Sequence, residues 1–89
     1  MDLNDFRQEI NKIDLELLNL IKKRMNISRK IGKFKRQNNL LIFDSQKEKE
    51  IFEELENLAK KKDLDKDFIK SLFKLIMNKS KKEQKCQKI

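Results

Sequence analysis

An apolar residue recurs in alternating steps of three and four along the first third of the chain. This spacing constrains the fold more than any other feature, because over about four heptads it is typical of a helix that buries a narrow stripe against another helix. We therefore expect a helix from Leu3 to about Gln37, roughly 50 Å long, which exceeds what one small protomer covers. The stripe consists of Leu3, Phe6, Ile10, Ile13, Leu17, Leu20, Ile27, Ile31 and Phe34, with one break at Arg24.

The break at Arg24 places a guanidinium on an otherwise apolar stripe. A guanidinium cannot lose its proton there, so it needs an anion or a carboxylate partner to avoid destabilising the helix. One interpretation is a polar residue that sets the register of the packed helices. The other is a buried anion-binding site, and the position of Arg24 alone does not separate the two.

The composition predicts an all-α protein. The chain has no Pro, a single Gly and abundant Leu, Ile, Lys and Glu, which suits helices and disfavours a turn-rich β fold. Its 89 residues predict one domain over residues 1–89, with a frayed tail over about residues 85–89. Gly32 lies inside the long helix, where it costs about 1 kcal/mol relative to Ala, so close approach of another group or simple tolerance must account for it.

Several classes of protein are disfavoured by the sequence. The longest apolar run, Leu40 to Phe43, is too short to span a membrane, and charges interrupt the first twenty positions, so we expect a cytoplasmic protein without a signal peptide. With no His and only Cys86, the chain forms no transition-metal cluster and no internal disulfide. We therefore expect no transition-metal site and a thiol without a role.

The net charge of +8 raises nucleic acid as a partner. The lysines, however, are spread over every helical face, and the chain has no Tyr or Trp on which bases could stack. Solvated surface explains most of this charge better, so we expect neither nucleic acid nor a membrane as a partner.

Two shorter helices are expected after the long one. The second opens near residue 44, where Ser45 and Glu48 have the spacing of a capping box, and it ends in lysines 60 to 62. The third starts after Asp65. Leu40 to Phe43 reads as a buried connection, so the fold predicted is a three-helix protomer.

Polar side chains fall on apolar arcs of these helices in four places. Most of these have an explanation without a binding site. Glu48 closes a capping box, Lys35 extends from a helix end to solvent, and the C-terminal residues mark the end of the apolar stripe. Together they supply cations, hydrogen-bond donors and one or two carboxylates, which fits a small dianion bearing a hydroxyl in a bundle interior. The four places are Arg24; Lys35; the group Asp44, Lys47 and Glu48; and Ser80 with Gln84.

Helix geometry limits which cations can share a ligand. Arg24 and Lys35 are eleven residues apart, ~16 Å on the same face, so two long side chains can converge on a small molecule between them. Arg7 precedes Arg24 by seventeen residues, ~25 Å, which is too far for both to reach one ligand from one chain. If Arg7 shares the site, it comes from a second subunit.

The pattern closely resembles the all-helical chorismate mutases over about residues 3 to 84. This resemblance implies an intertwined homodimer of three-helix protomers with two equivalent sites. It also implies the Claisen rearrangement of chorismate to prephenate, on the way to phenylalanine and tyrosine. The residues that carry the resemblance are Arg7, Ile13-Asp14, Arg24, Gly32-Lys33-Phe34-Lys35, Asp44, Lys47-Glu48, Ser80 and Gln84.

The resemblance also implies roles for these residues. Arg24 and Arg7 of the partner subunit would bind the two carboxylates of the substrate, helped by Ser80. Lys35 and Gln84 would donate to the ether oxygen, where negative charge grows as the C–O bond breaks. Such a reaction needs a restrained conformer and fixed donors, without a nucleophile, metal or redox cofactor.

Three further residues complete the implied site. Asp44 and Glu48 would meet the ring hydroxyl, Asp44 through its backbone. Lys47 would bind substrate, but it departs from the family, which more often has Arg there. The charge is kept while bidentate geometry is lost, so a weaker substrate affinity is one consequence.

Two alternatives remain open. An isochorismate-pyruvate lyase would share this scaffold and similar polar residues. A non-enzymatic dimeric coiled coil that binds nucleic acid through its lysines is the other, although the polar residues on the apolar arcs have no role in it.

Overall fold

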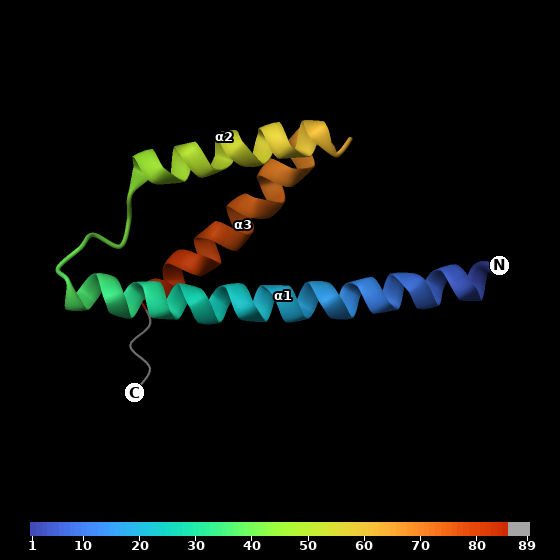
Figure 1. The fold of residues 1–89 in the computed structure, drawn as a ribbon, viewed down its shortest axis with the longest axis horizontal. Helices are drawn as coiled ribbons and strands as arrows, with labels where there is room; N and C mark the ends of the chain where they lie inside the picture. Colours follow the sequence, from blue (N-terminus) through green and yellow to red (C-terminus); the bar gives the residue numbers. More distant parts are fainter. Residues whose placement is uncertain (86–89) are drawn as a thin grey trace.

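The computed structural model describes residues 1–85 and contains three helices (Figure 1). Helix α1 covers Leu3–Gln37, α2 covers Ser45–Lys61 and α3 covers Lys66–Lys85. No strand occurs in these 85 residues, so the all-α prediction and the bounds of the long helix are confirmed. Cys86 and most of the predicted frayed tail lie outside the described residues.

Helix α3 connects the other two helices in space. It crosses obliquely from the end of α2 to the C-terminal half of α1, and it packs against both (Figure 1). The N-terminal end of α1 projects past both other helices, which gives the protomer its extended dimensions of 55 × 32 × 15 Å. The packed region is therefore confined to one end of the rod.

Aspartates cap the helices. The carboxylate of Asp2 accepts a hydrogen bond from the backbone N–H of Asp5 at 3.0 Å, and the carboxylate of Asp5 accepts one from the backbone N–H of Asp2. At α2 the carboxylate of Asp44 accepts from the backbone N–H of Lys47 at 3.1 Å. The predicted capping box of Ser45 is therefore wrong, because Asp44, with its extended backbone, takes the N-cap position and Ser45 is the first helical residue.

The apolar stripe of α1 is not buried within the protomer. Its N-terminal members are each at least 50% exposed, and α3 covers a neighbouring face formed by Met25, Ser28 and Gly32. Within residues 1–85, the expectation that another helix buries the stripe is thus not met. The exposed N-terminal members are Leu3, Phe6, Ile10, Ile13, Leu17 and Leu20.

Gly32 marks the closest approach of α1 and α3. A Cβ built there would lie 2.6 Å from the Cα and 2.7 Å from the carbonyl carbon of Gln84, and closer still to its carbonyl oxygen. Of the two explanations open at the sequence level, close approach is therefore the correct one.

No helix among residues 1–85 is long and apolar enough to cross a membrane.

Candidate active site

A cavity of about 340 Å³ opens where the C-terminal half of α1, the start of α2 and the end of α3 meet. Apolar walls come from Ile27 and Ile31 of α1, Ile51 of α2 and Met77 of α3. The cavity also brings together seven of the eight site residues predicted from the sequence. These are Arg24, Lys35, Asp44, Lys47, Glu48, Ser80 and Gln84.

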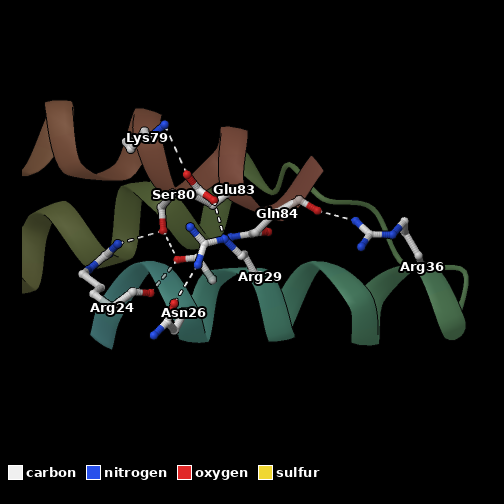
Figure 2. A network of polar contacts seen from close by, with 9 residues as sticks. Arg24, Asn26, Arg29, Arg36, Lys79, Ser80, Glu83 and Gln84 are labelled. Carbon is white, nitrogen blue, oxygen red and sulfur yellow. Dashed lines mark hydrogen bonds and ion pairs between the residues drawn. The ribbon is translucent and has the colours of Figure 1, made fainter. Parts of the chain in front are cut away.

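Arg24 is held at one end of the cavity by hydroxyl groups. Its Nη1 donates to Ser80 Oγ at 2.8 Å (Figure 2). Ser28 Oγ donates to the Arg24 carbonyl oxygen at 3.0 Å. Ser28 and Ser80, both buried, are hydrogen-bonded to each other. Burial lowers the pKa of the Arg24 guanidinium from its usual value. Among the described residues no carboxylate lies within 4.0 Å of this guanidinium, so its charge is not neutralised.

Lys35 and Gln84 meet toward the other end of the cavity. Lys35 Nζ donates to the Ile42 carbonyl oxygen at 3.0 Å and to Gln84 Oε1 at 3.5 Å. Arg36 donates to the backbone carbonyl oxygen of Gln84 (Figure 2), and the close approach at Gly32 fixes the same stretch of α3. Lys35 of α1 and Gln84 of α3 thus meet in one region of the cavity.

The start of α2 contributes three charged side chains that behave differently. Asp44 is committed to capping the helix, as described above. The Lys47 side chain is 68% exposed, and its Nζ lies 3.8 Å from Glu50 Oε2. Glu48 Oε2 lies 3.0 Å from Lys81 Nζ of α3, so Glu48 forms an ion pair rather than the predicted capping box.

Lys81 was missed by the sequence analysis, although it lines the cavity. Besides its pair with Glu48, its ammonium lies 4.6 Å from the centre of the Phe43 ring. A signal existed, because Lys81 follows Met77 by four residues and so continues one apolar face of α3. Ser28 was also missed, although it follows Arg24 by four residues and so lies on the same face of α1.

A second polar cluster ties α3 to α1 beside the cavity. Glu83 is buried and accepts from Arg29 Nε at 2.7 Å and from Lys79 Nζ at 3.2 Å (Figure 2). Arg29 also donates from Nη1 to Asn26 Oδ1 at 2.6 Å. The hydrogen bond from Lys79, with further contributions from Arg29, lowers the pKa of Glu83 against the opposing effect of burial. Lys79 and Glu83 have the i,i+4 spacing of a helical ion pair, whereas no spacing in the sequence indicates the contact of Arg29 with Glu83 across the two helices.

Arg7 is the one predicted site residue that lies outside the cavity. It is exposed and belongs to the projecting N-terminal part of α1. Within one protomer the helix holds it ~25 Å from Arg24, as the spacing predicts.

Comparison with known proteins gives the same family as the site residues. A sequence profile described as chorismate mutase type II matches residues 6–85. A bifunctional chorismate mutase/prephenate dehydratase of Buchnera aphidicola subsp. Schizaphis graminum is 42% identical over 84 residues, which are 94% of this chain and 22% of that protein. A chorismate mutase of Methanocaldococcus jannaschii is 28% identical over 83 residues, 93% of this chain and 84% of that one.

A solved structure has a similar fold. A conserved hypothetical protein from Pyrococcus furiosus superposes with a TM-score of 0.70 and 34% identity, covering 92% of this chain and 93% of that chain. The chain spans about a fifth of the length of the bifunctional relatives that it matches. With the profile covering nearly all of its helices and the predicted polar residues gathered in one cavity, the chain belongs to the chorismate mutase type II family.

Proposed function

We propose that this chain is a single chorismate mutase domain over residues 1–89, which rearranges chorismate to prephenate. The observation that carries the proposal is the convergence of Arg24, Lys35 and Gln84 on one cavity that also has apolar walls. Chorismate is a dianion with an ether oxygen and a ring hydroxyl, so it needs cations at its carboxylates and donors at the ether. The family supports the same reaction.

The donors at one end of the cavity suit the ether oxygen. Because Gln84 Oε1 accepts from Lys35, the amide nitrogen of Gln84 remains to donate to a ligand. Lys35 is charged before the reaction starts and acts by electrostatics, without transferring a proton. Both interactions strengthen as the C–O bond breaks and the oxygen gains negative charge, which is the condition for lowering the barrier.

The other end of the cavity suits a carboxylate. Arg24 keeps its charge, and the hydroxyl of Ser80 orients it. An apolar channel between Arg24 and Lys35 then favours the compact conformer, in which the two reacting ends of chorismate approach each other. Restriction of that conformer and stabilisation of the ether oxygen together account for catalysis.

The remaining residues contact the hydroxyl and the rim. Glu48 offers a carboxylate oxygen to the ring hydroxyl, while Asp44, whose side chain caps α2, acts through its backbone. Lys47 binds substrate once its ion pair with Glu50 has broken. That pair is weak, because it lies on the surface and its charged atoms are 3.8 Å apart.

The exposed stripe of α1 supports a homodimer. Leaving six large apolar side chains at least half exposed on one face is costly in water, and a second copy of the same helix would cover them. In such a dimer Arg7 of each subunit reaches the other subunit's cavity and supplies the second carboxylate partner. Sedimentation at micromolar concentration checks the dimer, and a folded monomer would contradict it.

The reaction itself is tested by incubating the purified chain with chorismate. We expect loss of the chorismate absorbance together with formation of prephenate, identified by mass spectrometry. A parallel incubation with isochorismate, in which pyruvate is measured, tests the lyase alternative. If neither prephenate nor pyruvate formed, the proposed activity would be contradicted, while the family assignment would stand.

A further inference from the structure

Lys81 joins three parts of the cavity wall. It projects from α3, pairs with Glu48 of α2 at 3.0 Å and lies over the ring of Phe43 in the connection before α2. The side chains of Lys81 and Glu48 are only 28% and 22% exposed, so water screens this pair less than the surface pairs. None of the roles assigned so far uses Lys81.

The nearby Lys47 shows what an uncommitted lysine does at this rim. Its side chain is 68% exposed and reaches only Glu50, at 3.8 Å. Lys81 instead faces inward, held by a carboxylate and an aromatic ring. The two lysines both line the cavity, yet only Lys81 is fixed within it.

The position of Lys81 affects the charge balance of the cavity. Four cationic and two anionic side chains line it, a net charge of +2 that matches a dianionic ligand. Glu48 is the anion whose carboxylate is not used as a helix cap, so without Lys81 it would stand unpaired beside that ligand. Its repulsion of the dianion would then be uncompensated.

We propose that Lys81 is a positioning residue of the active site that acts through Glu48. By pairing with one carboxylate oxygen it cancels the repulsion between Glu48 and a dianionic substrate. It also holds the carboxylate in place, so that its second oxygen can accept from a substrate hydroxyl. This inference rests on the proposed chorismate mutase activity and adds a residue to it.

The first experiment replaces Lys81 in the full-length chain. The dianion keeps its total charge during the rearrangement, so Lys81→Met should raise KM more than it lowers kcat. We expect KM to rise about tenfold, with kcat within about threefold of wild type. Lys81→Arg should restore KM to within about threefold, because it keeps the charge.

Lys82→Met is the matched control, since Lys82 is the next residue and is exposed. Its KM should stay within about twofold of wild type. If Lys81→Met behaved like Lys82→Met, the proposal would be wrong. Should Lys81→Met fail to fold, as judged by circular dichroism, Lys81→Gln takes its place.

A double-mutant cycle separates action through Glu48 from direct binding of the substrate. In a Glu48→Gln background the repulsion is already gone, so Lys81→Met should change KM by less than about twofold. A tenfold rise that persisted in this background would overturn the proposal. A wild-type chain that leaves chorismate unchanged would instead overturn the proposed function, and the inference with it, so the two failures are distinguishable.

Discussion

The two halves of α1 carry the same apolar stripe but differ in what surrounds it. In the N-terminal half, Leu3 to Leu20, the stripe residues are exposed, and neither of the other two described helices packs on them. In the C-terminal half, α3 covers Met25, Ser28 and Gly32, while Ile27 and Ile31 line the cavity. One periodic pattern therefore serves two different environments.

The comparison shows where helical periodicity stops being informative. Periodicity places side chains on one face, but the 20-residue α3 reaches only one end of the 35-residue α1. The covered half contains the cavity, and the exposed half carries Arg7. If a second subunit covers the exposed half, the exposed half of one subunit and the covered half of the other form one site, and the predictions below test that dependence.

The largest expected effect comes from replacing Arg7 and Arg24 in separate variants. We expect Arg7→Ala and Arg24→Ala homodimers each to lose at least about a hundredfold in kcat/KM, since each site lacks one carboxylate partner. When the two variants are refolded together, half of a statistical mixture is heterodimer, and each heterodimer has one intact site of two. About a quarter of wild-type activity should therefore return.

The outcome distinguishes sites shared between subunits from sites built by one chain. If one chain supplied both arginines, every site in the mixture would hold a lesion and no activity would return. Mass spectrometry of the refolded mixture tests whether heterodimers form. Absence of recovery despite confirmed heterodimers would falsify the shared site.

The next effect concerns the covered half alone. Lys35→Ala and Gln84→Ala should each lower kcat about a hundredfold, because loss of one donor to a developing oxyanion costs on the order of 3 kcal/mol. Lys33→Ala, an exposed lysine on the same helix, is the control and should keep normal turnover. Steady-state kinetics with chorismate measures all three, and near-normal turnover of Lys35→Ala would remove that lysine from the mechanism.

The covered half was largely predictable from the sequence, and the reason is geometric. Seven polar residues on apolar arcs were expected to share a site, and they line one cavity because helical periodicity fixes their faces. The start and end of α1 were predictable for the same reason. Asp65 was also expected to precede α3, and its carboxylate caps the helix by accepting from Asp67 and Phe68.

The failures have physical reasons as well. Asp44 and Ser45 are adjacent and both suit an N-cap, so spacing could not choose between them. Lys81 was hidden because the chain has 23 basic residues, of which most are explained as solvated surface. The Arg29 to Glu83 pair depends on how α3 lies on α1, and no local pattern encodes that crossing.

The exposed half is tested by charging its stripe. Leu17→Glu would place a carboxylate in the proposed dimer contact, and the dissociation constant should rise at least about a hundredfold, roughly 3 kcal/mol. Leu15 is 62% exposed and lies on the opposite face of the same helix, so Leu15→Glu is a matched control that should leave the dimer intact. Sedimentation velocity compares them, and equal behaviour of the two variants would argue against the stripe as the contact.

A smaller effect, of unusual sign, is expected at the helix crossing. Gly→Ala inside a helix ordinarily stabilises it by up to about 1 kcal/mol. Gly32→Ala should instead destabilise the protein by about 2 kcal/mol, because the new methyl group meets the backbone of Gln84, which a side-chain rotation cannot relieve. Chemical denaturation measures the change, and a stabilised variant would show that the helices can separate there without loss.

The smallest effect is a pH dependence that belongs to the covered half. Lys79 and Arg29 lower the pKa of Glu83 in the folded protein, so the ionised carboxylate stabilises the fold at neutral pH. This contribution should persist down to about pH 4.5, the ordinary value for the group, and should disappear as the pH falls further through the lowered folded pKa.

Glu83→Gln removes the titrating charge and keeps the shape of the side chain. At pH 7 the variant should unfold at a lower temperature than wild type, and the difference in Tm should shrink below about pH 4.5 and disappear once the pH has fallen through the lowered folded pKa of Glu83. Glu53→Gln, an exposed glutamate on α2, serves as the control and should show little difference at any pH. A Glu83→Gln difference that stayed constant from pH 7 to pH 3 would mean that packing, rather than charge, makes this residue stabilising. In that case Glu83 would stabilise the junction of α1 and α3 through its shape, as Gly32 does.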